Sequence, residues 1–101
     1  MPVSRFEDLI CWQEAAKLAV DIYSLSNTRK FSHDFGFRDQ LRRSAVSIPS
    51  NIAEGKERET VPELIRYLYI AKGSAGELKT QLYLGREIGY IADDQYVALR
   101  Q

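Results

Sequence analysis

The chain has 101 residues, of which 45% are hydrophobic and 28% charged, which excludes a disordered chain and indicates one domain over residues 1–101. Its 14 Lys and Arg residues balance 14 Asp and Glu residues, so bulk positive charge cannot attach it to nucleic acid, although a local basic patch stays open. A single cysteine, Cys11, and a single histidine, His33, exclude an internal disulfide, a cysteine-cluster zinc site and a multi-histidine centre. We therefore expect no metal and no cofactor.

The N-terminal residues carry charges where the apolar region of a signal peptide would lie. No apolar run approaches the ~20 residues that a membrane-spanning helix needs. The expected compartment is therefore the cytoplasm, with no membrane contact.

The first predicted helix covers about residues 9–25, because apolar residues recur there every three or four positions. They form two neighbouring stripes and hence a wide apolar face, which is typical of a helix that touches more than one neighbour. The stripes are Leu9, Trp12, Ala16, Ala19 and Tyr23, and beside them Ala15, Leu18, Ile22 and Leu25.

The second predicted helix runs through Pro49, which has no N–H to bond the carbonyl of Ala45. The apolar stripe keeps its phase across the proline, so the sequence favours a kinked helix over a broken one. Residues 26–28 and 32–36, before and at the start of this helix, carry loop signals. The stripe consists of Phe37, Leu41, Ala45, Ile48 and Ile52.

The third predicted helix has a heptad-like apolar repeat from Val61 to Gly85. Thr60 is a suitable N-cap for it. The small residues between Gly73 and Gly76 indicate either that another backbone approaches closely there or that the helix bends.

A fourth helix is predicted to begin near Asp93, and the chain ends at Gln101 about two turns later. No segment has a convincing strand pattern. The expected fold is all-α: an antiparallel up-and-down four-helix bundle whose fourth helix is short or truncated.

Polar residues on the second and third helices form what we call the polar seam. On the second helix they recur at spacings of three and four beside the apolar stripe, and the third helix offers a matching stripe that includes Gln81. Two interpretations stay open: a polar subunit interface or lumen, or a half-exposed face whose serines bond back to the helix. In the first, Glu54 is buried and pairs with Arg43 or Arg66. The seam comprises Gln40, Ser44, Ser47, Asn51, Glu54, Ser74 and Glu77.

Basic residues gather around the same second helix. Arginine side chains suit phosphate recognition, so we select Arg38, Arg42 and Arg43, the basic cluster, as candidate nucleic-acid-binding residues. The alternative is a network of surface salt bridges, because carboxylates are interleaved with these arginines. The surrounding cations are Arg29, Lys30, Lys56, Arg58 and Arg66, and the carboxylates are Asp34, Asp39, Glu54, Glu57 and Glu59.

Catalytic patterns are poor, and we expect no enzymatic activity. A hydrolase would have to combine Ser47 with His33, but the nucleophile-elbow motif of such enzymes is missing from the sequence. We keep this hydrolase only as a remote alternative.

Three segments resemble a known family. Residues 6–9 read FEDL and are followed by WQ at 12–13; residues 40–55 read QLRRSAVSIPSNIAEG; and residues 69–78 read YIAKGSAGEL. Together they resemble the bacterial four-helix-bundle proteins also called 23S rRNA intervening-sequence proteins. The resemblance extends from about residue 6 to residue 91, and the 16-residue segment is its most specific part.

The resemblance implies a ring-shaped homopentamer of small up-and-down bundles without enzymatic activity. Some members are encoded within intervening sequences of large-subunit rRNA genes. A relative, the accessory protein of diversity-generating retroelements, binds a reverse transcriptase and nucleic acid. The present chain is less basic than the nucleic-acid-binding relatives, and it ends earlier in the fourth helix.

The leading hypothesis is a non-enzymatic homo-oligomer, a pentamer by resemblance, that binds RNA, DNA or a nucleic-acid enzyme such as a reverse transcriptase. The alternative is a protein-protein interaction scaffold without nucleic-acid binding. Binding to RNA that weakens with salt would distinguish the first from the second.

Overall fold

The computed structural model describes residues 5–100, and all of its regular elements are helical. A short 3-10 helix, η1 (Phe6–Asp8), precedes α1 (Ile10–Leu25), and a single turn, α2 (Arg29–Ser32), links α1 to α3 (Phe35–Glu57). The chain continues through α4 (Val61–Glu87) into the short α5 (Asp93–Arg100). No strand occurs within these 96 residues, in agreement with the all-α prediction.

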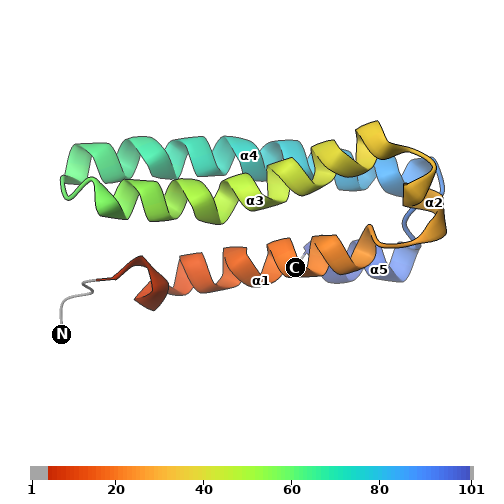
Figure 1. Ribbon diagram of the computed structural model, residues 1–101, viewed down its shortest axis with the longest axis horizontal. Coiled ribbons are helices and arrows are strands. Elements are labelled where there is room, and N and C mark those ends of the chain that lie inside the picture. The colour runs from red at the N-terminus through yellow and green to blue at the C-terminus, as the bar shows by residue number, and fades with distance from the viewer. Residues whose placement is uncertain (1–4, 101) are drawn as a thin grey trace.

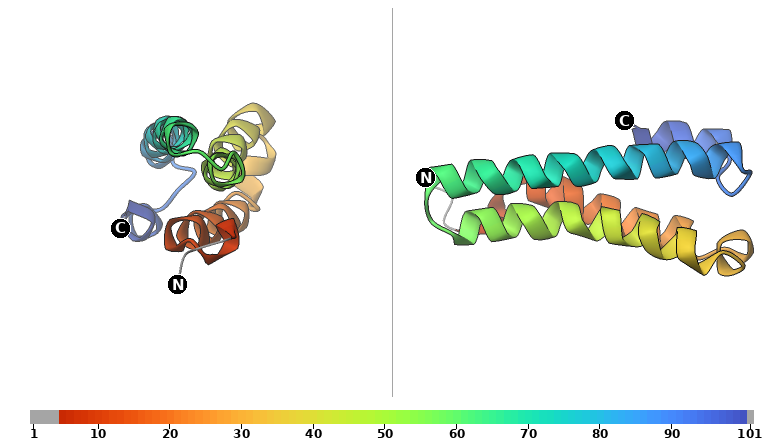
Figure 2. Two further views of the ribbon diagram at one scale, coloured as in Figure 1. Left: turned by 90° about the vertical axis from the view of Figure 1, so that its left-hand side faces the viewer. Right: turned by 90° about the horizontal axis from the view of Figure 1, so that it is seen from above.

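Successive long helices run in opposite directions along an elongated molecule (Figure 1). α3 packs against both α1 and α4, whereas α1 and α4 make few contacts with each other. The end-on view shows α5 at the fourth corner, beside the C-terminal half of α4 (Figure 2). Apolar residues from all four helices form one core, with Ile22, Phe31 and Leu41 fully buried.

The helix boundaries follow local capping chemistry. The Asp34 carboxylate accepts a hydrogen bond from the Phe37 amide at the start of α3, and Thr60 Oγ1 accepts one from the Glu63 amide at the start of α4. The expected N-cap Thr60 is therefore confirmed. α3 continues through Pro49 without a break.

The connection between α1 and α3 is more ordered than the sequence indicated. It contains the helical turn α2, and the ring of Phe31 in this turn is fully buried against the rings of Phe37 and Tyr90. Tyr90 also donates a hydrogen bond to Asp34, which raises the pKa of the Tyr90 phenol. These contacts close the end of the molecule where α2 meets the α4–α5 turn.

The closest helix contacts occur at glycines other than those expected. A Cβ atom on Gly55 would lie 2.8 Å from Tyr67 Cβ, and one on Gly85 would lie 2.7 Å from Ile91 Cδ1. A Cβ atom on Gly73 or Gly76 would meet no atom within 4 Å. Of the two alternatives that the small residues left open, the close approach of another backbone at Gly73 or Gly76 is therefore wrong within residues 5–100.

No helix between residues 5 and 100 has the length and hydropathy needed to cross a bilayer.

The contact at Gly55 gives a direct test of this packing. We expect Gly55→Ala to lower the free energy of unfolding by about 1–3 kcal/mol, because Tyr67 Cβ is fixed to the α4 backbone and cannot move aside. Gly73→Ala is the matched control: it adds a methyl group to open space and should raise that free energy by about 0.5–1 kcal/mol. Urea unfolding of both variants checks the expectation, and equal midpoints would contradict it.

Candidate functional site

Most of the polar seam lines one cleft between α3 and α4. The cleft has a volume of about 310 Å³. Its α3 wall comes from positions 40, 43, 44 and 47, and its α4 wall from positions 74, 77 and 81, which the helical repeat places on facing sides. The lining residues are Gln40, Arg43, Ser44, Ser47, Ser74, Glu77 and Gln81.

Hydroxyl and amide groups join the two helices at one end of this cleft. Ser47 Oγ and Ser74 Oγ lie 2.8 Å apart and share a hydrogen bond between α3 and α4. The Asn51 amide donates to the Ser47 carbonyl at 2.8 Å and to Ser47 Oγ at 2.9 Å. These three residues are half-buried. The seam is thus a cross-helix contact at Ser47 and Ser74 as well as a lining of the cleft.

Glu54 does not belong to this contact. Its side chain is half exposed and lies 3.7 Å from Arg58 Nε, one helical turn further along α3. Arg66, one of the partners expected for it, instead bonds Glu63 at 3.4 Å. The interpretation in which Glu54 is buried and pairs with Arg43 or Arg66 is therefore wrong in the single chain, and the solvated alternative holds for this residue. An exposed ion pair one turn apart contributes at most about 1 kcal/mol.

The cleft holds polar groups that lack partners in the described part of the chain. Gln81 Oε1 is buried and accepts no hydrogen bond within residues 5–100. Arg43 and Glu77 are exposed on opposite walls, and within the same residues they form no ion pair with each other. The cleft therefore presents a cation and an anion for contacts outside the chain, and it holds one buried acceptor that no donor in the described residues reaches.

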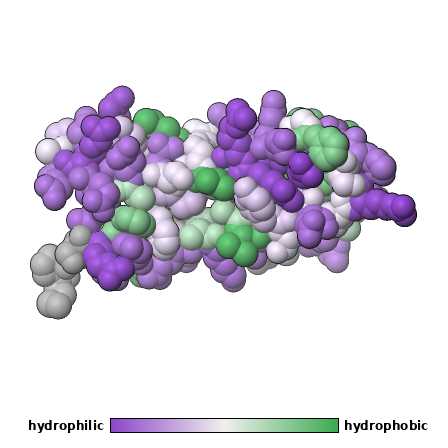
Figure 3. Space-filling model, in the orientation of Figure 1, coloured by the Kyte–Doolittle hydropathy of each residue, from purple (hydrophilic) through white to green (hydrophobic). Residues whose placement is uncertain are grey.

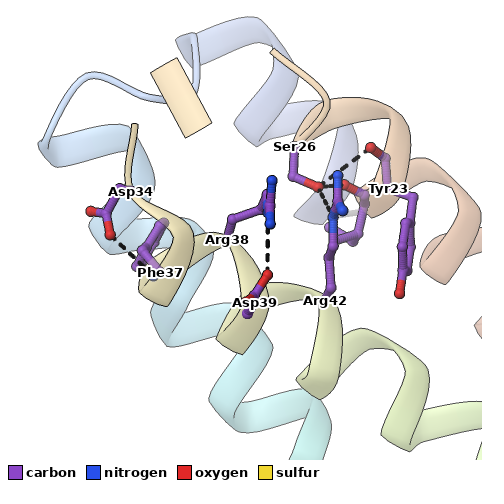
Figure 4. Close-up of polar contacts among 8 residues, drawn as sticks. Tyr23, Ser26, Asp34, Phe37, Arg38, Asp39 and Arg42 are labelled. Carbon is purple, nitrogen blue, oxygen red and sulfur yellow. Dashed lines mark hydrogen bonds and ion pairs between the residues drawn. The ribbon is translucent and has the colours of Figure 1, made fainter. Parts of the chain in front are cut away.

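The three arginines of the basic cluster differ in the contacts that their side chains make. Figure 4 shows the contacts of Arg38 and Arg42. Arg42 Nε donates to Ser26 Oγ at 2.8 Å, and its guanidinium lies 4.5 Å from the centre of the Tyr23 ring. Arg38 pairs with Asp39 at 3.2 Å and stacks on the Phe35 ring. Arg42 therefore fastens α3 to the end of α1.

Arg43 differs from its two neighbours in the basic cluster. No hydrogen bond or ion pair within residues 5–100 engages its side chain, which lies at the rim of the cleft. Of the three candidate arginines, it is the one whose guanidinium is available for a ligand.

The structure does not bring Ser47 and His33 together. His33 caps the end of α2, whereas Ser47 lies twelve residues into α3, roughly 18 Å along the helix axis. Ser47 is engaged by Ser74 and Asn51 instead.

The sequence matches the family of 23S rRNA-intervening sequence proteins over residues 7–101. The chain belongs to this family. The match contains the whole polar seam and the basic cluster, so the α3–α4 cleft lies inside the region that defines the family. No curated protein matches the chain.

Two features of this family member were beyond the sequence analysis. Ser26 carried a loop signal, yet its buried hydroxyl donates to the Ile22 carbonyl at 2.7 Å and accepts from Arg42. Gln81 had the right spacing for the seam, but no sequence signal indicates that its oxygen lacks a donor. Both facts depend on the relative placement of two helices.

The different environments of adjacent arginines generate a stability prediction. Arg42→Ala should lower the free energy of unfolding by about 1–3 kcal/mol, because it removes a hydrogen bond from a charged group and the stacking on Tyr23. Arg43→Ala should change it by no more than about 0.5 kcal/mol. The urea unfolding midpoints of the two variants test this prediction. An equal decrease in the free energy of unfolding of both variants would assign Arg43 a structural role as well.

Proposed function

We propose that the chain is the subunit of a closed homo-oligomer without enzymatic activity. In this proposal each subunit is an up-and-down four-helix bundle whose short fourth helix is α5. The family resemblance implies a ring-shaped homopentamer, and this is the form of the assembly that we propose. A ring built from one repeated contact closes with cyclic symmetry.

The exposed apolar surface is the observation that carries this proposal. Among the residues that the structure describes, fourteen large hydrophobic residues are exposed, as many as the hydrophobic residues that form the buried core. Figure 3 shows hydrophobic residues at the surface between hydrophilic ones, on the face seen in Figure 1. We propose that part of this apolar surface is buried between subunits, because large exposed apolar patches mark interaction sites.

Apolar side chains in the N-terminal half of α4 support the same proposal. Within the described residues, α5 lies beside the C-terminal half of α4, as Figure 2 shows. Val61, Ile65 and Leu68 in the N-terminal half are 68%, 48% and 38% exposed. A partner subunit would remove this surface from water.

Light scattering tests the assembly. At micromolar concentration the scattering mass should equal five chains of 11.6 kDa each. A larger or smaller closed oligomer would replace the pentamer but keep the proposal. A monomer would overturn it.

Nucleic-acid binding is the second proposed function, and the free guanidinium of Arg43 favours it. A ring repeats this side chain once per subunit and places several cations around one assembly, although the chain has no net charge. Repetition raises avidity without new contacts. We propose weak, sequence-tolerant binding to RNA or DNA in which Arg43 contacts phosphate, with Arg38 in a lesser role and Arg42 as a structural residue.

Salt titration of RNA binding tests this second function. Arg43→Ala should lower affinity about equally for all sequences and flatten the log-affinity against log-salt slope by about 0.7–0.9 for each phosphate that the variant no longer neutralises. Lys17→Ala on α1 removes the same charge from an exposed position and should change the slope less. If the wild type does not bind at ~50 mM salt, the protein scaffold takes the place of this function, with a protein such as a reverse transcriptase as its partner.

A further inference from the structure

A hollow of about 530 Å³ lies between the C-terminal end of α1 and the N-terminal half of α3. We call it the α1–α3 hollow. It adjoins the α3–α4 cleft, because Arg43 and Ser47 line both. The residues that line the hollow are Tyr23, Asp39, Arg42, Arg43, Val46 and Ser47. The free guanidinium of Arg43 and the ring of Tyr23 therefore border the same open space.

The ring of Tyr23 is held in place without being covered. The guanidinium of Arg42 lies 4.5 Å from the centre of this ring, and Figure 4 shows the two groups beside each other. Arg42 Nε is itself bonded to the buried hydroxyl of Ser26. Tyr23 is nevertheless 45% exposed. A ring whose orientation is already fixed binds a flat ligand at a low cost in conformational entropy.

The charge around the hollow is positive. Arg42 and Arg43 are opposed by Asp39, the one carboxylate among the described residues that line it, and Asp39 pairs with Arg38 at 3.2 Å. Glu77 lies on the far wall of the cleft and does not line the hollow. The α1 residues on the same side as Tyr23 are uncharged; they are Trp12, Ala16, Ala19 and Val20. The hollow therefore suits a ligand that carries an anionic group beside a flat ring.

An unpaired nucleotide has both features. Its base has a flat face that stacks on aromatic side chains, whichever base it is, and its phosphate pairs with the fork of an arginine. Bases inside a duplex stack on one another and leave no face for Tyr23. The ring is thus of use for binding a single strand, whereas Arg43 alone would serve for either kind of strand.

We propose that the α1–α3 hollow binds an unpaired base of single-stranded nucleic acid, which stacks on Tyr23 while Arg43 contacts the phosphate. Arg42 is a positioning residue that orients the ring. This inference rests on the proposed nucleic-acid binding and adds the class of strand to it. Stacking tolerates every base, so it agrees with sequence-tolerant binding.

Three probes of equal length test the stacking on the wild type. They are oligothymidylate, an abasic strand with the same phosphates, and a DNA duplex. Phosphate charge alone favours the duplex, because its charge density is higher. We expect oligothymidylate to bind more tightly than the duplex, and at least about fivefold more tightly than the abasic strand, which is the low end of the contribution of one stacked base. Fluorescence anisotropy at ~50 mM salt measures the three affinities.

Variants assign the effect to the ring. Tyr23→Leu should remove the preference for oligothymidylate over the abasic strand, whereas Tyr23→Phe keeps the ring and should keep the preference. Arg43→Ala should weaken the binding of all three probes. Tyr69→Leu is the matched control: it removes a ring that is 68% exposed on α4 and should leave the affinities unchanged. Circular dichroism verifies the helix content of each variant, and if Tyr23→Leu does not fold, the three probes on the wild type still decide.

The outcomes separate this inference from the function on which it rests. Equal affinity of the wild type for oligothymidylate and the abasic strand, or tighter binding of the duplex, would overturn the stacking while nucleic-acid binding stands. The same holds if Tyr23→Leu keeps the preference, or if Tyr69→Leu loses it. If the wild type binds none of the three probes, the proposed nucleic-acid binding itself fails.

Discussion

The close contact between α3 and α4 is the constraint on which the rest of the structure depends. It is anchored where Gly55 meets Tyr67, where Ser47 bonds Ser74, and where Gly85 faces the ring of Phe37. Small groups at these points let the two helices run side by side over most of their length. The cleft, the outer side of α3 and the exposed side of α4 all take their positions from this one contact.

The regular part of the fold could be predicted because it is encoded locally. Apolar spacing and cap residues such as Thr60 determine where the helices lie and begin. Phe31 was missed because a four-residue turn has no periodicity, and its burial depends on Tyr90, far away in sequence. The role of each glycine could not be predicted from the sequence either. Gly55 lies against another helix and Gly73 does not, and residue spacing within one helix does not specify which glycine lies at a helix contact.

The candidate site could be predicted as a set of positions but not as a set of contacts. Helical spacing correctly brought Gln40, Ser47, Ser74 and Glu77 to one surface, and the structure places all four around the cleft. Helical spacing could not predict that Arg42 and Arg43 make different contacts. Adjacent residues of a helix point about 100° apart, so they meet different elements. Helical spacing also failed for Glu54, whose partner lies on its own helix.

The peripheral position of α1 has a consequence for how the protein opens. Because α1 packs against α3 and makes few contacts with α4, its detachment would leave the α3–α4 hairpin and its hydroxyl bridge in place. Local opening in proteins follows such contact boundaries, and units with fewer neighbours open at lower free energy. We therefore expect α1 to open at a lower free energy than the α3–α4 hairpin, and the Arg42–Ser26 hydrogen bond to hold its C-terminal end against α3.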